Sequence, residues 1–550
     1  MTKVAVIGAG WSGLYALKYL LAEGIEVTCY EKANVIGGVW RIAQEQTVVA
    51  SSSKTYMHPS DFPFDDSTDD FPTSKQVNEH LEKYADHFDL WDHIQLNSNV
   101  QSVEYINKKW HLLVEIDCVT HHIIVDKLVI AQGLAQKPYV PQHLSDMFSR
   151  LPCIHERNVQ WNQQLPSWMS DGKVLVVGGG ESAIDCAVRL ASCTNKQVVL
   201  SFRTGRWLMN KLKQPSYLFP ADVTSRKTFH MFKFDWFVNF FDWYLTKSFG
   251  VGLHGIKEWE PPKGVSSWGC FLNKRGDDAI PLIRKGKIVP AGGIRSIDNN
   301  NFVQFENTEQ PHQISGVVFA TGYHSKDNLL SWISPSEAYR HVFPTDSRFY
   351  ASLAFIGAAR PNLGSVSCMA EIASIWMAKV FSGKVTLPSI DNALQRIQAD
   401  TDKRLKNFGK DGKNYPTLVR LIDYIDLVLG DLGMRYIVTG APPVNLLWTY
   451  GLIKGARVWR SLYFVGWTPL EYLVLFDSNG KGLHTLETIK RMNKDRKCRS
   501  PDSLLCHMVK FATAWMATNL MCKCRNIDFR VVLVMIILTM LLIYVVSNFI

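Results

Sequence analysis

The stretch VAVIGAGWSG at residues 4–13 decides the fold of the first part of this chain. Four apolar residues predict a short buried strand, and the glycines that follow have the spacing G-x-G-x-x-G. In that pattern the first glycine turns the chain into a helix and the second lets a pyrophosphate approach the backbone. The third lets the helix pack closely on the strand. Because amide groups at the helix N-terminus favour phosphates, the stretch predicts a dinucleotide site.

The next strand indicates which nucleotide the first turn binds. Residues 26–30 (EVTCY) predict this strand, and Glu31 ends it. A carboxylate at that point binds both ribose hydroxyls, which favours an unphosphorylated adenosine such as that of FAD or NAD. The residues expected to bind this nucleotide are Gly8, Ala9, Gly10, Trp11, Ser12, Gly13, Glu31 and Lys32.

A second glycine turn follows the apolar run VLVV at residues 174–177. Ala183 stands where the third glycine is expected, which the pattern tolerates. The next predicted strand, residues 197–202, ends at Arg203 and not at an acid. A guanidinium there suits the 2′-phosphate of NADPH, although a solvated surface arginine is the other interpretation of Arg203. The residues expected to bind NADPH are Gly178, Gly180, Glu181, Ser182, Ala183, Asp185, Arg203 and Arg206.

Alternating strand and helix signals predict an α/β fold with two Rossmann-like nucleotide-binding domains, each built on a parallel sheet. Residues 125–131 have the pattern of a strand that leads to Gly133, and residues 317–320 are their counterpart in the second half. The NADPH-binding domain is expected to be inserted in the FAD-binding domain. The first part of the FAD-binding domain is expected at 1–165, and the NADPH-binding domain at 166–325 with an aromatic insertion at about 210–270. The second part of the FAD-binding domain and a helical region are expected at 326–490. A basic linker is expected at 491–530 and a transmembrane helix at 531–550.

Further motifs accompany the two turns. They are GGVWR at 37–41, DFPF at 61–64, FATGY at 319–323, LAFIG at 353–357, Arg360-Pro361, Gly364 and Ala370-Glu371. In this order and spacing they resemble the flavin-containing monooxygenases, over residues 1 to about 455 and again at the hydrophobic C-terminus. The resemblance implies FAD at the first turn and NADPH at the second. It also implies cofactor contacts at Gly38, Val39, Trp40, Ser52, Thr321 and Gly322.

The resemblance implies an NADPH-dependent monooxygenase of the N,N-dimethylaniline type. In this family NADPH reduces the flavin, and oxygen adds to form a flavin hydroperoxide, which retained NADP⁺ shields from water. The distal oxygen then passes to a soft nitrogen or sulfur nucleophile, here expected to be a lipophilic small molecule. Because the cofactors carry the chemistry, no acid–base pair is required and no metal site is expected.

Ser51 is the residue at which this chain departs most from the family. An asparagine usually precedes the Ser-Ser-Lys that matches residues 52–54, and its amide is implicated in holding the hydroperoxide and the nicotinamide. A serine is shorter and offers one hydroxyl in place of a carbonyl and two N–H donors. Ser51 is therefore the expected catalytic position, and its identity puts oxygenation in doubt more than NADPH oxidation.

Two more departures keep other functions open. In the family motif F-x-G-x-x-x-H, His155 keeps the histidine, but Ser149 and Leu151 stand where the phenylalanine and the glycine are expected. Ser315 replaces an acid before the FATGY motif. The alternatives are an NADPH oxidase that releases peroxide, a Baeyer–Villiger oxygenase of ketones on the same scaffold, and a membrane-tethered flavoprotein that oxygenates nothing.

Charge and cysteine content exclude some classes of protein. The 550 residues carry a net charge of +10, and residues 490–530 alone hold ten Lys or Arg against three Asp or Glu. The remainder is nearly neutral, so nucleic-acid binding is not expected, and the basic stretch is typical of attraction to anionic lipid. Eleven scattered cysteines without a C-x-x-C pair indicate free thiols in a reducing compartment.

The last twenty residues predict a membrane anchor. Residues 531–550 contain no charged side chain, and as a helix they would span roughly 30 Å, the hydrocarbon thickness of a bilayer. Lys523, Arg525 and Arg530 precede them, which favours a cytosolic catalytic body, and the family resemblance implies the endoplasmic reticulum. The aromatic segment 229–249 is expected either to lie in the lipid headgroup zone or to form an internal cluster. The oligomeric state is not predicted.

Overall fold

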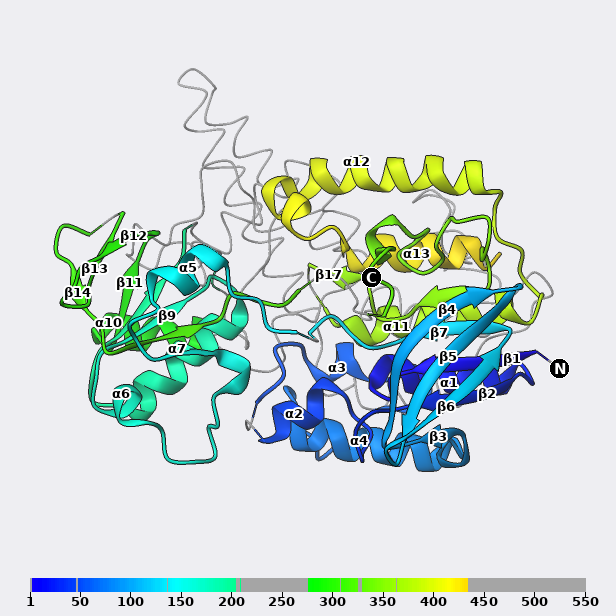
Figure 1. Cartoon of the computed structure of the whole chain (residues 1–550), viewed down its shortest axis with the longest axis horizontal. Coiled ribbons are helices and arrows are strands. Elements are labelled where there is room, and N and C mark those ends of the chain that lie inside the picture. Colours follow the sequence, from blue (N-terminus) through cyan, green and yellow to red (C-terminus); the bar gives the residue numbers. More distant parts are fainter. Residues whose placement is uncertain are drawn as a thin grey trace, which may run out of the picture.

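The computed structural model describes residues 2–45, 48–135, 137–203, 208, 276–306, 308–324, 329–362 and 364–433. Figure 1 shows that these residues form two α/β halves, one around β1 and one around β9, with segments of chain crossing between them. Arg206, the aromatic segment 229–249, the basic linker and the apolar residues 531–550 lie outside the described residues.

The first half is built on a five-stranded parallel sheet with the order β16-β7-β1-β2-β3. Its strands are β1 (Lys3–Ile7), β2 (Glu26–Tyr30), β3 (Ile94–Gln95), β7 (Lys127–Ile130) and β16 (Leu353–Phe355). The central strand β1 is buried from Val4 onward because both faces of the sheet are covered, as is usual for parallel sheets.

Different elements cover the two faces of this sheet. On one face Val4 and Val6 pack in a core with α1 (Trp11–Ala22) and α11 (Val366–Phe381). On the other face Ala5 and Ile7 pack with a three-stranded antiparallel sheet, whose strands are β4 (Ser98–Ile106), β5 (Lys109–Ile116) and β6 (Val119–Val125). The alternation of side chains along β1 thus supplies two separate cores.

The second half repeats the plan with the strand order β11-β10-β9-β15-β8, again parallel. Its strands are β8 (Cys153–His155), β9 (Val174–Val177), β10 (Val198–Ser201), β11 (Ile288–Ala291) and β15 (Gly316–Phe319). One face packs on α7 (Glu181–Cys193), α6 (Ser167–Ser170) and α10 (Gly276–Arg284). Near the other face lie α5 (Gln142–Met147) and the antiparallel strands β12 (Ile294–Ile297), β13 (Phe302–Phe305) and β14 (His312–Gln313).

Two segments connect the halves and are hydrogen-bonded to each other. All strands of the second sheet lie between β7 and β16 in the sequence, so the chain leaves the first sheet at residues 131–140 and returns at 320–324. The Tyr139 N–H donates to the Gly322 carbonyl at 2.9 Å, and the His324 N–H donates to the Lys137 carbonyl at 2.9 Å. We call residues 131–140 and 320–324 the crossing segments.

Most of the remaining elements surround the first sheet (Figure 1), whereas the turn Glu156–Asn158 follows β8 of the second sheet. The remaining elements are α2 (Val39–Glu45), α3 (Lys54–Met57), α4 (Ser74–His87), α12 (Ile390–Asn414), α13 (Leu421–Asp431), the short parallel pair β17 (Arg360–Pro361) and β18 (Leu418–Val419), and the 3-10 turns Trp91–His93, Glu156–Asn158 and Pro335–Glu337. Within the described ranges, no helix is both long and apolar enough to span a bilayer.

The predicted α/β class with parallel Rossmann-like sheets is confirmed. The strand predicted at residues 125–131 is present as β7 but starts two residues later, because the chain turns at Asp126 between two sheets. Strand β6 ends at Val125 and β7 begins at Lys127. The Asp126 carboxylate between them accepts a hydrogen bond from the Lys3 N–H at 2.8 Å, which ties the turn to β1.

Candidate functional site

The first glycine turn has the geometry that close helix–strand packing requires. Gly8 has φ +100°, a conformation that L side chains rarely adopt, and its N–H donates to the Tyr30 carbonyl at 2.8 Å. A Cβ added at Gly13 would lie 1.7 Å from the Gly8 carbonyl oxygen, so α1 can start this close to β1 only without a side chain there. The N-terminus of α1 therefore opens directly at the end of the sheet.

Glu31 is held at the end of β2 by two backbone donors. Its Oε2 accepts from the Ala9 N–H at 2.7 Å, and its Oε1 accepts from the Ala33 N–H at 2.9 Å. The residue is buried. Because a carboxylate has about four acceptor positions, both oxygens can still accept from ribose hydroxyls. This geometry fits the ribose contact predicted for Glu31.

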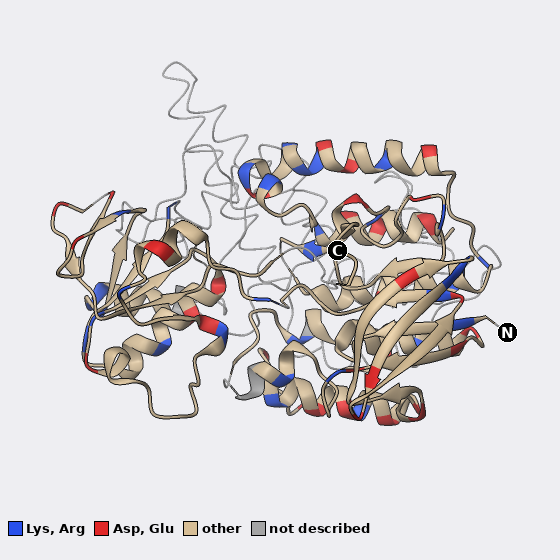
Figure 2. Ribbon diagram, viewed as in Figure 1, with Lys and Arg blue, Asp and Glu red and all other residues tan. Residues whose placement is uncertain are grey.

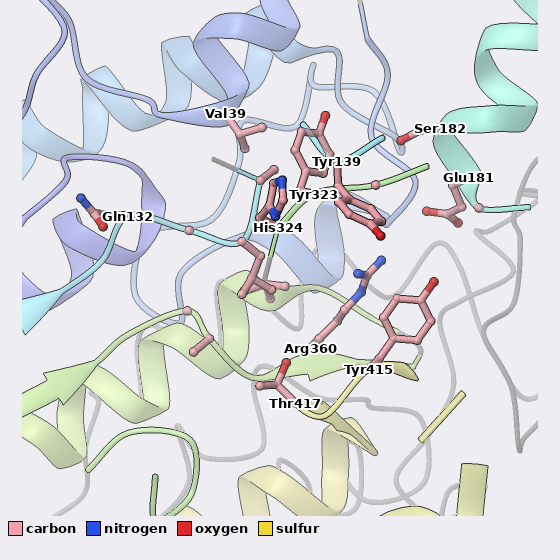
Figure 3. Close-up of a pocket in the computed structure, with 18 of the residues that line it drawn as sticks. Val39, Gln132, Tyr139, Glu181, Ser182, Tyr323, His324, Arg360, Tyr415 and Thr417 are labelled. Atoms are coloured by element: carbon pink, nitrogen blue, oxygen red, sulfur yellow. The ribbon is translucent and has the colours of Figure 1, made fainter. Parts of the chain in front are cut away.

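One cavity of about 2510 Å³ extends across both halves of the molecule. Single small-molecule sites usually enclose roughly 300–1,000 Å³, so this space can hold two dinucleotides. In Figure 3, Val39 from the first half and Glu181 and Ser182 from the second border the same space. The predicted residues that line it are Gly8, Gly10, Trp11, Ser12, Glu31, Lys32, Gly38, Val39, Trp40, Ser51, Ser52, Gly178, Gly180, Glu181, Ser182, Arg203, Thr321 and Gly322.

Four other predicted residues lie behind the cavity wall. Ala9 contacts Glu31 through its N–H, and Gly13 and Ala183 serve the packing of α1 and α7 on their strands. Asp185 lies one turn into α7, where its charge acts on the half-buried Glu156. Arg206 lies outside the described residues.

The walls at the first turn form a cradle that fits a flat or extended cofactor. A Cβ added at Gly38 would lie 3.1 Å from the Gly10 Cα, so two glycine backbones face each other across the floor of the cavity. Trp11 is nearly buried beside this floor and donates its Nε1–H to the Tyr15 hydroxyl. The donor set of a helix N-terminus, Glu31 and a glycine floor suits the adenosine and pyrophosphate of FAD.

Ser51 and Ser52 lie side by side in the sequence and both line the cavity. The Ser52 hydroxyl donates to the Gly364 carbonyl at 2.8 Å, so it joins the loop before α3 to the loop before α11. Ser51 is half-buried on the cavity wall. The Ser52 hydroxyl is thus used in a hydrogen bond that joins two loops. Ser51 is the serine that we expect to act on bound cofactor or substrate.

His155 keeps the second crossing segment in place although the motif around it is degraded. Its Nδ1 accepts from the Arg157 N–H at 3.3 Å, so its Nε2 donates to the Gly322 carbonyl at 3.0 Å. Burial lowers the pKa of His155, which keeps the ring neutral near pH 7. The histidine therefore acts on the position of Gly322 and not as an acid.

Sequence reasoning missed a cluster around Tyr323. Its hydroxyl donates to Glu156 Oε1 at 3.0 Å, and burial raises the pKa of both groups. Arg157 lies over the Tyr323 ring at 5.7 Å and donates to the Ala135 carbonyl in the first crossing segment. These contacts hold both crossing segments in place beside the cavity. Tyr323 ends the FATGY motif, which is the one sequence signal that could have pointed to it.

Two parallel sheets that each end in a glycine turn on one shared cavity define an oxidoreductase that binds two dinucleotides. The chain belongs to the flavin-binding monooxygenase-like family, which it matches over residues 1–539. This match confirms the family, the enzyme type and the use of FAD and NADPH expected from the sequence.

Individual relatives agree with this assignment. Flavin-containing monooxygenase 1 of Homo sapiens is 28% identical over 429 residues, which cover 74% of this chain and 79% of the human protein. The S-allyl-L-cysteine S-oxygenase of Allium sativum superposes with a TM-score of 0.54 at 19% identity and covers 84% and 93% of the two chains. The NADP⁺-bound cyclohexanone monooxygenase of Rhodococcus sp. Phi1 gives a TM-score of 0.55 at 15% identity, covering 78% and 97%. The two structural likenesses concern the fold.

Proposed function

We propose that this chain is an FAD- and NADPH-dependent monooxygenase of soft sulfur and nitrogen nucleophiles. The observation that carries the proposal is the single cavity onto which both glycine turns open. With a thioether as substrate, one atom of O₂ joins the sulfur and the other leaves as water. NADPH supplies a hydride and solvent supplies a proton.

Residues of the first half would bind FAD. Gly10, Trp11 and Ser12 at the N-terminus of α1 would hold the pyrophosphate, and Glu31 would accept hydrogen bonds from the ribose hydroxyls. When bound, FAD supplies the transfer of electrons from NADPH to oxygen. Ser51 would offer its single hydroxyl to the bound groups, and the buried Trp11 side chain in the cavity lining would help to exclude water.

Residues of the second half would bind NADPH. The N-terminus of α7, at Gly180 to Ser182, offers amide donors to the pyrophosphate, and Arg203 at the end of β10 would pair with the 2′-phosphate. Thr321 and Gly322 in the second crossing segment would support the nicotinamide end. Arg206 stays a sequence-based candidate for the same phosphate.

Reduction of the bound flavin by NADPH tests this assignment. The purified protein should carry a yellow flavin whose absorbance NADPH bleaches in the absence of oxygen, and NADH should bleach it more slowly. A protein that is colourless and takes up no added FAD would contradict the proposal. A flavin that NADPH cannot bleach would favour the non-oxygenating alternative.

We further propose that residues 531–550 anchor the protein in the endoplasmic reticulum membrane with a cytosolic catalytic body. The support is the charge-free apolar run and the cations before it. The division into domains at 165/166 and 325/326 belongs to the same proposal. A variant without residues 531–550 should move from the membrane fraction to the soluble fraction, and unchanged sedimentation would contradict the anchor.

A further inference from the structure

One wall of the cavity is formed by residues that lie outside both glycine turns and outside the cofactor contacts predicted from the sequence. Strand β17 places Arg360 there, and its backbone is fixed because the Arg360 N–H donates to the Thr417 carbonyl at 2.9 Å. The guanidinium lies over the Tyr415 ring, 5.0 Å from its centroid. Figure 3 shows Arg360 pointing into the cavity from the side opposite Glu181, with Tyr415 and Thr417 beside it. We call the lining residues from 358 to 420 the β17–α12 wall.

The β17–α12 wall has an excess of positive charge. It contains four cations and one acid: Arg360, Lys406, Lys410, Arg420 and Asp411. The rest of the described lining is balanced, with four acids and four cations: Glu31, Glu181, Glu306, Glu337, Lys32, Arg41, Arg157 and Arg203. Figure 2 shows Lys and Arg gathered at the end of α12 that faces the second half. The positive excess therefore lies on one wall of the cavity.

Arg420, one of the four cations on this wall, is desolvated by its surroundings. Burial lowers the pKa of the Arg420 guanidinium, and the nearby Asp423 opposes this lowering only in part. Arg420 also stacks at 6.0 Å on Phe408, an apolar partner. A cation in such surroundings is stabilised when an anion enters the adjacent space.

The phosphates of the two cofactors have other partners. The N-termini of α1 and α7 serve the pyrophosphates, and Arg203 serves the 2′-phosphate, as proposed above. We infer that the β17–α12 wall selects a substrate that carries a carboxylate next to its soft sulfur or nitrogen, and that Arg360 binds this carboxylate. The inference rests on the proposed function and names the substrate class of the same site. An arginine stacked by its face keeps its N–H donors at the edge, where a carboxylate binds in a bidentate manner.

Calorimetric binding of two matched ligands tests the inference without turnover. The probes are (methylthio)acetate and (methylthio)acetamide, which differ in charge and hardly in shape, added to the full-length protein as isolated. The acid should bind at least about tenfold more tightly than the amide, as expected for charge-assisted hydrogen bonds. Arg360→Gln should remove this preference, and Arg360→Lys should retain part of it. The control Lys413→Gln replaces an exposed cation outside the cavity lining and should retain the whole preference.

Two results would overturn the inference. Equal affinity of the wild-type protein for acid and amide would remove the anion preference. Loss of NADP⁺ affinity in Arg360→Gln, with the acid preference intact, would make Arg360 a cofactor residue. Oxygenation of the amide without acid preference would leave the proposed function standing while the inference fails. A flavin that NADPH cannot reduce would overturn the proposed function, and the binding comparison would still decide the inference.

Discussion

At the scale of single residues, we expect Ser51 to determine how much oxygenation the cavity supports. It lines the cavity beside Ser52, whose hydroxyl is bonded to Gly364, so Ser51 supplies one hydroxyl where relatives are expected to supply an amide. An asparagine would add a carbonyl and two N–H donors at the same place.

Ser51→Asn should raise the ratio of oxygenated product to hydrogen peroxide by about tenfold, which corresponds to one added hydrogen bond. The measurement counts both products for each NADPH consumed. Ser51→Ala is the control and should lower the ratio. An unchanged ratio in both variants would mean that Ser51 does not act on the reacting groups.

Gly13 is the second residue whose substitution has a specific expected effect, here on the stability of the fold. Because its added Cβ would lie 1.7 Å from the Gly8 carbonyl oxygen, Gly13→Ala must push α1 away from β1. We expect a loss of about 3 kcal/mol in the free energy of unfolding and loss of bound flavin. The control Gly430→Ala, in α13 with open space around it, should be neutral or slightly stabilising. Equal unfolding midpoints in urea for both variants would contradict this packing.

At the scale of elements, α4 brings a buried histidine into an aromatic core. His80 stacks on Phe64 with ring centroids 4.0 Å apart, and its Nε2 finds no hydrogen-bond partner among the described residues. Burial lowers the pKa of His80 to about 3, and nearby His58 acts in the same direction. The unfolded chain therefore binds this proton more readily, so stability present above pH 6.5 is lost as the pH falls toward 3.

This linkage predicts a loss of about 2 kcal/mol in the free energy of unfolding between pH 7 and pH 5. In His80→Phe this part of the pH dependence should disappear, whereas the exposed control His121→Gln should keep it. Urea unfolding at the two pH values measures the difference. The same pH dependence in all three proteins would show that His80 is not the group responsible.

We expect the end of β10 to decide between the two nicotinamide coenzymes. Arg203 follows this strand by two residues, is exposed and lines the cavity beside the second glycine turn. Arg203→Gln should lower kcat/KM for NADPH by about tenfold or more, because charge-assisted hydrogen bonds to the 2′-phosphate are lost, and leave NADH unchanged. An equal loss for both coenzymes would mean that Arg203 has a structural role.

Elements with local signals were predictable from the sequence, and those formed by distant segments were not. Strands 26–30 and 174–177 were predicted with the bounds of β2 and β9 because apolar runs end at glycines or charges. The bond between the crossing segments joins Tyr139 to Gly322, and the cation–π pair joins Arg360 to Tyr415. Such contacts depend on how the halves meet, which local patterns do not encode.

At the scale of the whole molecule, the fold holds two glycine turns on one cavity although 170 residues separate Gly8 from Gly178. The second sheet is inserted between strands of the first, and the bonded crossing segments keep the two turns facing each other. The family was predictable because its motifs are contiguous in sequence. The β17–α12 wall was not predictable as a unit because its cations come from separate elements.

The decisive measurement counts NADPH consumed, sulfoxide formed and hydrogen peroxide released when the purified flavoprotein turns over a thioether in air. If the enzyme excludes water from the reacting groups in this cavity, the sulfoxide formed should account for most of the NADPH consumed. Peroxide equal to the NADPH consumed, with no sulfoxide, would contradict oxygenation and leave an NADPH oxidase.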